Sequence, residues 1–430
     1  MNDEQQAIGV VGVGWVGLVT ATCFAELGHP VIALDIVEEK VEALRRGEVT
    51  IHEPGLAEIL ARNAERLTFT TSVDEALAGA RLLFCCVDTP PTYSGDADLS
   101  RVRAVVQNLP KDSDHALVMK STVPSGTGAA IRRDKPDLAY VSCPEFLKEG
   151  TAIDDFMKPD RVVIGADAGS EWAADAVEDL YRPLGGELVR TDVASAEMIK
   201  LASNAFLATK ISFINEIANV CEQTGADVTE VARGMGLDRR IGPSFLQAGV
   251  GYGGSCFPKD VSALKQLAGN SGYHFQLLNA VIEVNELQKR RVIAKLEKHL
   301  GSLVGKRIAL LGLAFKPDTD DMREATSLVL SARLQGEGAV VTAYDPVAER
   351  SAAGLLPSVQ LANSAAEALA GADAAVLVTE WKEFAELDWP ALSESMARPL
   401  VVDGRNFLDA EALRDAGFTY EGIGRPNGDS

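Results

Sequence analysis

The residues best suited to covalent chemistry stand in one run, Gly251-Tyr252-Gly253-Gly254-Ser255-Cys256-Phe257-Pro258-Lys259-Asp260. Glycines allow a backbone to approach a ligand closely. A cysteine between a glycine run and an expected helix can have its thiolate stabilised by the helix N-terminus. The run therefore predicts a nucleophilic role for Cys256, whereas Cys23 and Cys221 are better explained as small buried apolar residues.

Two further groups of polar residues are placed to act on a reacting oxygen. Lys200 and Asn204 are four apart in an expected helix, so they share a face. A cation and an amide donor together can stabilise an oxyanion, although on this segment alone a solvated lysine and a surface asparagine are the better explanation. Residues 120–127 and 144–150 follow expected strands, where open α/β folds bind their ligands. Helix capping is the other explanation for their hydroxyls and carboxylates.

A glycine pattern near the start of the chain is typical of dinucleotide binding. Gly12-x-Gly14-x-x-Gly17 follows an expected strand and opens an expected helix. The three glycines permit a tight turn, close approach to a pyrophosphate and close helix packing, in that order. Asp35 ends the second strand, where a carboxylate accepts hydrogen bonds from a ribose 2′-hydroxyl and repels a 2′-phosphate. The pattern favours NAD over NADP, although Lys40 is a nearby cation that could accept a phosphate.

The elements that must position these residues alternate between strand and helix at both ends of the chain. Strands are expected at residues 8–11, 31–34, 82–87, 117–119, 162–164, 308–311, 340–344, 375–378 and 400–402. Helices are expected at residues 16–27, 195–223, 275–300 and 326–335. This order predicts an α/β protein with two Rossmann-like doubly wound parallel-sheet domains, joined by a helical middle domain with a long central helix. The predicted boundaries are residues 1–190, 191–300 and 301–430.

Composition excludes several classes of protein. The 430 residues include 41 Lys plus Arg and 62 Asp plus Glu, for a net charge of −21. Such acidity argues against nucleic-acid binding and against docking on anionic lipid. The six cysteines form no C-x-x-C pair, so we expect no metal site and no disulfide framework. No apolar run is long enough to cross a bilayer, and residues 1–6 lack the pattern of a signal peptide, so a cytoplasmic location is expected.

Taken together, the motifs resemble the UDP-glucose 6-dehydrogenase family, within the wider group of nucleotide-sugar dehydrogenases. The resemblance extends over residues 8–425. It is carried by the Gly12 fingerprint, Glu53-Pro54-Gly55-Leu56, and residues 120–127, 144–150, 159–165, 200–216, 253–260, 312–317 and 320–325. It implies a four-electron oxidation of UDP-glucose to UDP-glucuronate with two NAD, in which a cysteine thiohemiacetal and then a thioester form. The first domain would bind NAD, the last would bind the UDP-sugar, and the middle helices would form a homodimer or a higher homo-oligomer.

The resemblance also implies roles for single residues. Cys256 would be the nucleophile, Lys200 and Asn204 would stabilise the oxyanions, Asp260 and Thr122 would position water, and Glu149 would be the base in thioester hydrolysis, with Glu145 nearby. Contacts to the cofactor would come from Gly12, Gly14, Gly17, Asp35, Lys40, Thr89, Thr122, Glu149 and Arg323. Contacts to the substrate would come from Phe146, Leu147, Lys200, Asn204, Arg240, Tyr252, Gly253, Lys316 and Arg405. Arg240 would reach the site of a neighbouring subunit.

The choice of sugar depends on fewer residues. Ser255 before Cys256 and Phe257 after it resemble the UDP-glucose type, whereas GDP-mannose and UDP-N-acetylhexosamine enzymes are the alternatives with the same mechanism. A catalytically silent NAD or nucleotide-sugar sensor and a one-step hydroxyacid dehydrogenase are the other hypotheses. Three positions depart from the usual family pattern: Asp88, Cys143 and Lys148. None of them removes a catalytic group, but Asp88 adds a carboxylate near the expected NAD pocket.

Overall fold

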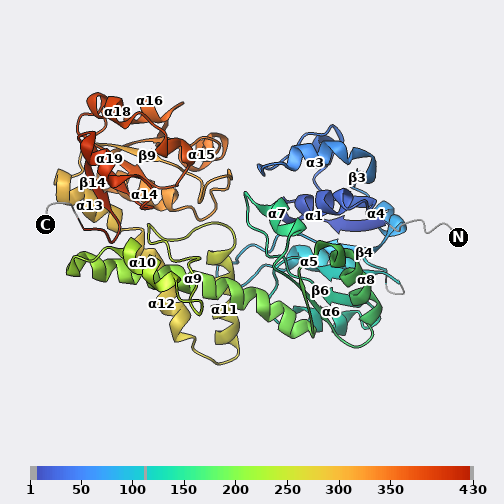
Figure 1. The fold of residues 1–430 in the computed structure, drawn as a ribbon. Coiled ribbons are helices and arrows are strands. Elements are labelled where there is room, and N and C mark those ends of the chain that lie inside the picture. The colour runs from blue at the N-terminus through green and yellow to red at the C-terminus, as the bar shows by residue number, and fades with distance from the viewer. Residues whose placement is uncertain (1–6, 111–113, 427–430) are drawn as a thin grey trace. The chain divides into compact units, whose positions relative to one another are not determined.

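The computed structural model describes residues 7–110 and 114–426, so residues 1–6, on which the absence of a signal peptide was judged, lie outside it. The chain divides into two compact units, and each is described by itself. The first comprises Met1–Ser203 and Ser262–Tyr273, and the second comprises Asn204–Val261 and His274–Ser430. Both units are drawn in Figure 1 with their elements labelled. The domain boundaries near residues 190 and 300 stay a prediction.

The first unit is built on an eight-stranded sheet. Its strands are β1 (Ala7–Val11), β2 (Val31–Leu34), β3 (Leu67–Thr70), β4 (Ala80–Cys85), β5 (Ala116–Met119), β6 (Ala139–Ser142), β7 (Arg161–Ala166) and β8 (Glu187–Thr191). They lie in the order β3-β2-β1-β4-β5-β6-β7-β8. Every neighbouring pair is parallel except β6 and β7, which are antiparallel. The first six strands follow the dinucleotide-binding order, in which β1 and β4 flank the switch point where ligands bind.

Helices cover both faces of this sheet, because the buried strands alternate between two cores. Ala116 and Val118 of β5 enter one core, and Leu117 and Met119 enter the other. The helices that connect these strands are α1 (Trp15–Glu26), α2 (Glu38–Arg45), α3 (Leu56–Arg62), η1 (Ala64–Arg66), α4 (Val73–Gly79), α5 (Ser100–Asn108), α6 (Thr127–Asp134), α7 (Ala152–Met157), α8 (Glu171–Tyr181) and η2 (Arg182–Leu184). Helices α1, α3, α7 and α8 pack on the first core, and α5 and α6 on the second.

The second unit contains a sheet that repeats the same topology. Its strands are β9 (Arg307–Leu311), β10 (Val340–Tyr344), β11 (Gln360–Leu361), β12 (Ala374–Leu377), β13 (Leu400–Asp403) and β14 (Thr419–Gly422). All are parallel, in the order β11-β10-β9-β12-β13-β14. Its helices are α14 (Thr326–Gly336), α15 (Glu349–Leu355), α16 (Ala365–Leu369), α17 (Lys382–Ala385), α18 (Trp389–Ser395) and α19 (Ala410–Asp415). The predicted class, two Rossmann-like sheets with a helical middle region, is confirmed.

Helices dominate the stretch between the two sheets. They are α9 (Val193–Thr224, 32 residues), α10 (Val228–Gly236), α11 (Phe257–Asn270), α12 (Gln276–Gln288) and α13 (Arg291–Leu300). The predicted long helix near 195–223 is confirmed. The predicted helical stretch over 275–300 is also confirmed, and it consists of two separate helices, α12 and α13. No glycine or proline marks that break. Instead Gln288, the last residue of α12, is buried and bonds a distant backbone oxygen.

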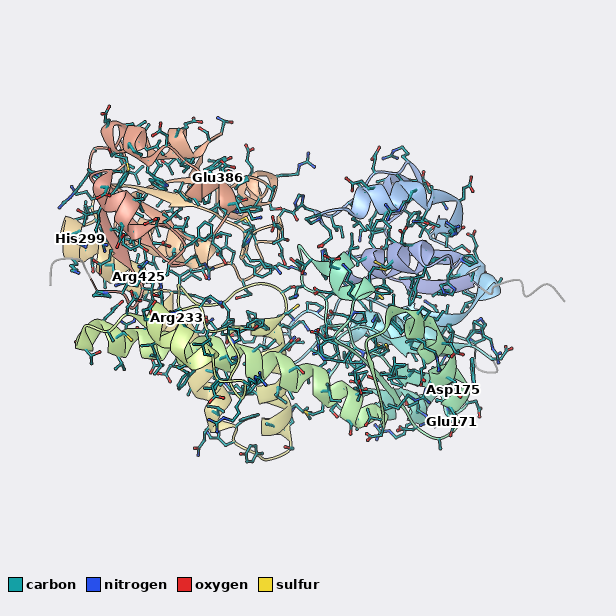
Figure 2. The ribbon with its side chains drawn as sticks, in the orientation of Figure 1. Glu171, Asp175, Arg233, His299, Glu386 and Arg425 are labelled. Carbon is teal, nitrogen blue, oxygen red and sulfur yellow. The ribbon has the colours of Figure 1, made fainter. Side chains whose placement is uncertain are left out.

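Part of the acidic excess lies on solvated helix faces. Glu171 and Asp175 are exposed on α8, as the side-chain view in Figure 2 shows. They accompany buried Ala173, Ala174 and Val177, so α8 presents one apolar and one acidic face. Across residues 7–110 and 114–426 no helix is both long and apolar enough to cross a membrane.

Candidate active site

The glycine turn between β1 and α1 has the geometry that the fingerprint predicts. Gly12 has φ +89°, a left-handed conformation that side-chain-bearing residues rarely adopt. A Cβ added at Gly17 would lie 1.8 Å from the Gly12 carbonyl oxygen, so only glycine fits there. Gly14 precedes α1, and its carbonyl accepts the Leu18 N–H at 2.9 Å. The exposed N–H groups of a helix start at this turn are suited to phosphate.

Asp35 lies at the end of β2 and is directed toward this turn. Its Oδ2 accepts the Val13 N–H at 2.9 Å, and its Oδ1 accepts the Val37 N–H at 3.0 Å. Lys40 Nζ lies 3.4 Å from Oδ2 and forms an ion pair with it. The carboxylate is therefore fixed beside the glycine turn, which is where a ribose hydroxyl would need an acceptor.

The loops that follow β4 and β5 are joined to each other. Thr89 Oγ1 donates to the Thr122 carbonyl oxygen at 2.8 Å, and Ser121 Oγ donates to the Val87 carbonyl oxygen at 2.6 Å. The unusual carboxylate of Asp88 pairs with Arg101 at 2.7 Å. A Cβ at Gly14 would lie 3.6 Å from Asp88 Oδ1, which places this carboxylate next to the glycine turn with its charge already paired.

A buried ion pair connects the loop after β6 to α9. Lys200 Nζ lies 3.1 Å from Glu145 Oε1, and both side chains are almost fully buried. Glu145 Oε2 accepts the Leu147 N–H at 2.6 Å. The ring of Phe146 has the Arg161 guanidinium 3.6 Å from its centroid and Lys200 Nζ 5.3 Å from it. Burial lowers the pKa of Arg161.

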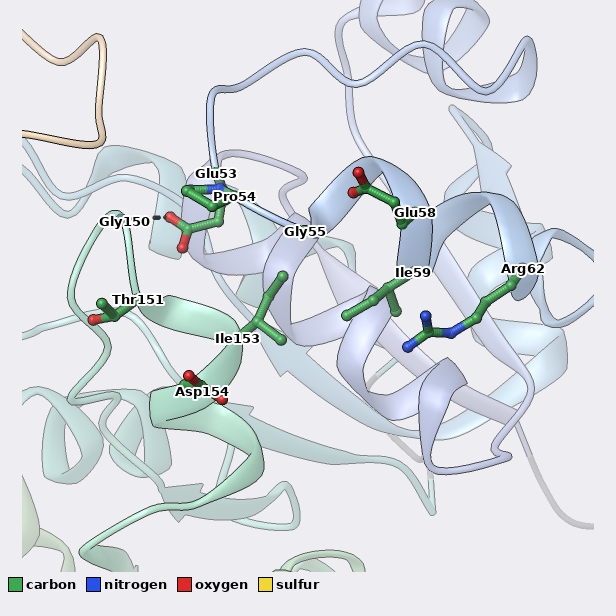
Figure 3. Close-up of a pocket in the computed structure, with 10 residues that line it drawn as sticks. All are labelled: Glu53, Pro54, Gly55, Glu58, Ile59, Arg62, Gly150, Thr151, Ile153 and Asp154. Carbon is green, nitrogen blue, oxygen red and sulfur yellow. Dashed lines mark hydrogen bonds between the residues drawn. The ribbon is translucent and has the colours of Figure 1, made fainter. Parts of the chain in front are cut away.

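Glu149 is buried in the same loop, and the residue after it is held by Glu53. Glu53 Oε2 accepts the Gly150 N–H at 2.8 Å and the indole N–H of Trp15 at 3.2 Å, while its Oε1 accepts the Ala152 N–H at 2.8 Å. Figure 3 shows Glu53 at an open pocket, which is lined by residues of α3, of α7 and of the segments that precede these two helices. The pocket volume is about 360 Å³. None of the predicted site residues is among those that line this pocket.

In the second unit, Asn204 and Asp260 form a buried pair. Asn204 Nδ2 donates to Asp260 Oδ2 at 2.6 Å, and Lys259 Nζ lies 2.6 Å from Oδ1. Asn204 is 6% exposed and Asp260 1%. The carboxylate is therefore oriented by one amide and one cation, an arrangement that can hold a polar ligand or a water molecule.

Cys256 stands directly before α11, and its carbonyl accepts the first helical N–H, from Asp260, at 2.9 Å. It is exposed, whereas the other five cysteines are buried. Burial raises the pKa of Cys85 to about 11 and, together with Glu26 and Glu53, that of Cys23 to about 12, so these thiols stay protonated near neutral pH. The position at a helix N-terminus favours the thiolate of Cys256.

The other predicted substrate residues of the second unit differ in their contacts with the rest of the protein. Arg405 donates to the carbonyl oxygens of Val378 at 2.7 Å and Gly251 at 3.2 Å. Lys316 Nζ lies 5.4 Å from the centroid of the Phe315 ring. A Cβ at Gly253 would come within 2.2 Å of a backbone oxygen, so the loop packs closely there. Arg405 therefore links the segment after β12 to the glycine loop.

Two predicted arginines are tied to neighbouring aspartates. Arg323, the predicted cofactor contact, forms a bidentate pair with Asp321, and Arg240, the predicted contact to another subunit, forms one with Asp238. The side chain of Arg240 is 89% exposed. The structure thus brings together Glu145, Phe146 and Lys200 in the first unit and Asn204 and Asp260 in the second, with Cys256 four residues before Asp260. The roles of these residues and of Arg240 and Arg323 stay predictions.

Sequence reasoning assigned no role to three residues that contact the loops of the predicted site: Glu53, Arg161 and Glu197. Glu53 and Arg161 stand in motifs that carried the resemblance, and those motifs were the available signal. Glu197 had no such signal in the sequence. On α9, its carboxylate accepts the N–H groups of Gly126 at 2.7 Å and Gly128 at 2.8 Å, and burial raises its pKa. Within the described parts of the chain, no group of three or more His, Cys, Asp or Glu side chains is arranged to hold a metal ion.

Three family models match the chain in order. They describe the NAD binding domain (residues 6–185), the central domain (194–287) and the UDP binding domain (309–410) of the UDP-glucose/GDP-mannose dehydrogenase family. A UDP-glucose 6-dehydrogenase of Pseudomonas aeruginosa is 48% identical over 97% of each chain. UDP-glucose 6-dehydrogenase TuaD of Bacillus subtilis is 44% identical, over 97% of this chain and 93% of its own. A UDP-glucose dehydrogenase from Pyrobaculum islandicum matches the structure with a TM-score of 0.90, at 38% identity and 99% coverage of both chains.

Proposed function

Because the chain belongs to the UDP-glucose/GDP-mannose dehydrogenase family, we propose that it oxidises UDP-glucose to UDP-glucuronate, with two NAD reduced per substrate. The single observation that carries the chemistry is the exposed thiol of Cys256 at the start of α11, after a glycine loop. A four-electron oxidation at one carbon needs such a nucleophile, because an aldehyde must be converted into a second hydride donor.

Electrons and atoms balance over two oxidations and one hydrolysis. In the first oxidation, the C6 alcohol loses a proton and a hydride and becomes an aldehyde. The Cys256 thiolate then adds to the carbonyl carbon and forms a thiohemiacetal. Loss of a second hydride gives a thioester, and water cleaves the C–S bond, which yields the carboxylate and regenerates the thiol. NAD, when bound, supplies the hydride acceptor for each oxidation.

Polar residues other than Cys256 would supply the remaining parts of this chemistry. Lys200 and Asn204 would stabilise the alkoxide and the thiohemiacetal oxygen, because a cation and an amide N–H both favour developing negative charge. Asp260 and Thr122 would position the hydrolytic water, and Glu149 would take a proton from it. The burial of Lys200, Asn204 and Asp260 supports these roles, since a charge acts more strongly where water is excluded.

Substrate and cofactor contacts are proposed from the same elements. The glycine turn, Asp35 and Thr89 would hold NAD, with Lys40 and Arg323 near it. Phe146, Leu147, Tyr252, Lys316 and Arg405 would hold the UDP-sugar, and Arg240 would serve a neighbouring subunit. The Gly17 position, where any side chain would strike the Gly12 carbonyl, supports close packing of helix and strand under a pyrophosphate. A cytoplasmic location is proposed with this function.

The test is the yield of NADH per nucleotide sugar in purified protein. We expect two NADH per UDP-glucose consumed, and a ratio of one would contradict the two-step mechanism. Cys256→Ala is expected to form no UDP-glucuronate, whereas Cys221→Ala, a matched change of a buried cysteine, is expected to form it. GDP-mannose and UDP-N-acetylhexosamines in the same assay test the alternative substrates. Binding of UDP-glucose without NADH formation would favour a sensor.

A further inference from the structure

Three buried amide side chains hold the backbone of the loop that leads to Cys256. We call Asn215, Asn285 and Gln288 the amide clamp. Asn215 is on α9, and the other two are on α12. Their exposed fractions are 0%, 3% and 1%. A buried amide is costly unless it is hydrogen-bonded, so a clamp of this kind favours one conformation of the backbone that it bonds.

Asn285 makes the central contacts of the clamp. Its Oδ1 accepts the Tyr252 N–H at 2.8 Å, and its Nδ2 donates to the Tyr252 carbonyl oxygen at 3.1 Å. The amide thus satisfies both backbone groups of one residue, as a paired strand would. The preceding residue must be glycine, because Gly251 has φ +90° and a Cβ there would lie 2.7 Å from Asn285 Oδ1.

The other two amides fix the start of the same loop. Gly249 donates its N–H to Asn215 Oδ1 at 2.9 Å, and its carbonyl oxygen accepts from Gln288 Nε2 at 2.9 Å. Gln288 lies three residues after Asn285, so both project from the same side of α12. The two amides of α12 therefore bond Gly249 and Tyr252, which are three residues apart in the loop.

We propose that Asn285 is a positioning residue for the reaction, which acts through the loop backbone on Cys256. Tyr252, which it bonds, precedes Cys256 by four residues, and the loop enters α11 directly after the thiol. Cys256 can use the N–H groups at the start of α11 only if the chain enters that helix at one angle. The proposal rests on the function proposed above, because it assigns Asn285 to the cysteine step.

The experiment compares Asn285→Leu with Asn279→Leu. Asn279 is on the same helix, but its amide bonds the Phe275 carbonyl oxygen and is near His274, away from the loop. Asn285→Asp is a second variant, which keeps an acceptor for the Tyr252 N–H. Two readouts are made on folded protein: kcat with UDP-glucose and NAD, and the pH dependence of iodoacetamide labelling at Cys256, followed by intact mass with Cys256→Ala as the blank.

We expect Asn285→Leu to lower kcat about tenfold or more. The pH at which Cys256 labelling is half-maximal should move toward the pKa of an ordinary thiol, about 8.5. Asn279→Leu should leave both unchanged, and Asn285→Asp should fall between the two. An unchanged midpoint and an unchanged kcat per folded molecule in Asn285→Leu would overturn the proposal and leave Asn285 a structural residue. Iodoacetamide labelling of Cys256 needs no substrate, so it tests the role of Asn285 independently of the proposed function. The proposed function would fail on a different result, the formation of UDP-glucuronate by Cys256→Ala.

Discussion

Asp35 shows how one side chain can serve the fold and still keep capacity for a ligand. Its two oxygens accept N–H groups from the glycine turn and from Val37, and Lys40 pairs with it. Asp345 stands at the same place in the second sheet, where its oxygens accept five N–H donors, including the Trp381 indole. Asp345 is therefore committed to the protein, whereas Asp35 keeps more capacity for a ribose.

Replacing Asp35 with Asn should shift the enzyme toward NADP. The change keeps an acceptor for the Val13 N–H but removes the charge that repels a 2′-phosphate and leaves Lys40 available to attract one. We expect the ratio of kcat/KM for NADP to that for NAD to rise about tenfold, or about 1.4 kcal/mol. In the double variant Asp35→Asn with Lys40→Ala this rise should be lost. An unchanged ratio in Asp35→Asn would show that Asp35 does not select the cofactor.

The Lys200–Glu145 pair should respond differently to single and double substitution. Lys200→Met leaves a buried carboxylate without its cation, which typically costs about 3–5 kcal/mol. Lys200→Met with Glu145→Gln removes both charges, so we expect the free energy of unfolding to recover by more than half. Urea unfolding followed by circular dichroism measures the difference. Equal destabilisation of the single and double variants would mean that the pair is not coupled.

At the scale of elements, Glu421 links β14 to α13. Its carboxylate accepts from His299 at 2.8 Å, Lys295 at 3.1 Å and Lys298 at 3.0 Å. Lys295 also lies 2.7 Å from Glu222 in the last turns of α9. His299 is labelled on α13 in Figure 2. Burial alone would raise the pKa of Glu421, but the His299 bond and the two lysines lower it to about 2.

Glu421→Gln should therefore destabilise the second unit in a pH-dependent way. A carboxyl group whose pKa is lower in the folded state stabilises the fold above its unfolded pKa, about 4.3. At pH 7 we expect a loss of about 2 kcal/mol in the free energy of unfolding. As the pH falls from about 4.3 toward the folded value, the difference between variant and wild type should shrink. Glu297→Gln, on the exposed face of the same helix, is the control, and a pH-independent loss would contradict the account.

The limits of sequence reasoning follow from the lengths and contacts of particular elements. Apolar runs such as residues 31–34 and 308–311 predicted strands because both faces are buried. β11 was missed because it has two residues, and β8 because Glu187 and Arg190 interrupt its apolar pattern. The clustering of Lys200 with Glu145 joins residues 55 apart, and the bonds of Asn285 join residues 33 apart. Spacing along the chain carries no signal for such contacts, and only the family motifs pointed to the first.

At the scale of the whole molecule, a stripe of exposed apolar side chains follows α9. Phe206, Phe213 and Val220 are seven residues apart, and 66%, 49% and 57% exposed. Residues at this spacing share one face of a helix. A chain with a net charge of −21 gains solubility from its acidic surface, so an apolar stripe of this kind needs an explanation. The stripe supports the predicted homodimer or higher homo-oligomer formed through the middle helices.

Phe213→Asp should weaken that homodimer, because it places a charge at the centre of the stripe. We expect light scattering after size exclusion to show a dimer mass, or a multiple of it, for wild type. The variant should show monomer mass at micromolar concentration. Leu355→Asp, which replaces an exposed apolar residue on α15, should leave the mass unchanged. A wild-type monomer, or an unchanged mass in Phe213→Asp, would place the interface elsewhere.

The outermost strands of the two sheets bear on a hazard that every open sheet faces. An uncovered edge strand has unpaired backbone N–H and C=O groups that can pair with a strand of another molecule, and long, flat, apolar edges lead to aggregation. The edge strands are β3 and β8 in the first sheet and β11 and β14 in the second. Of these, β11 is only two residues long, and β8 exposes Glu187 and Arg190. Neither β8 nor β11 offers a long apolar template, so strand-to-strand pairing between molecules is disfavoured at these two edges. Association of molecules into fibres through β8 or β11 is therefore disfavoured, even at high protein concentration.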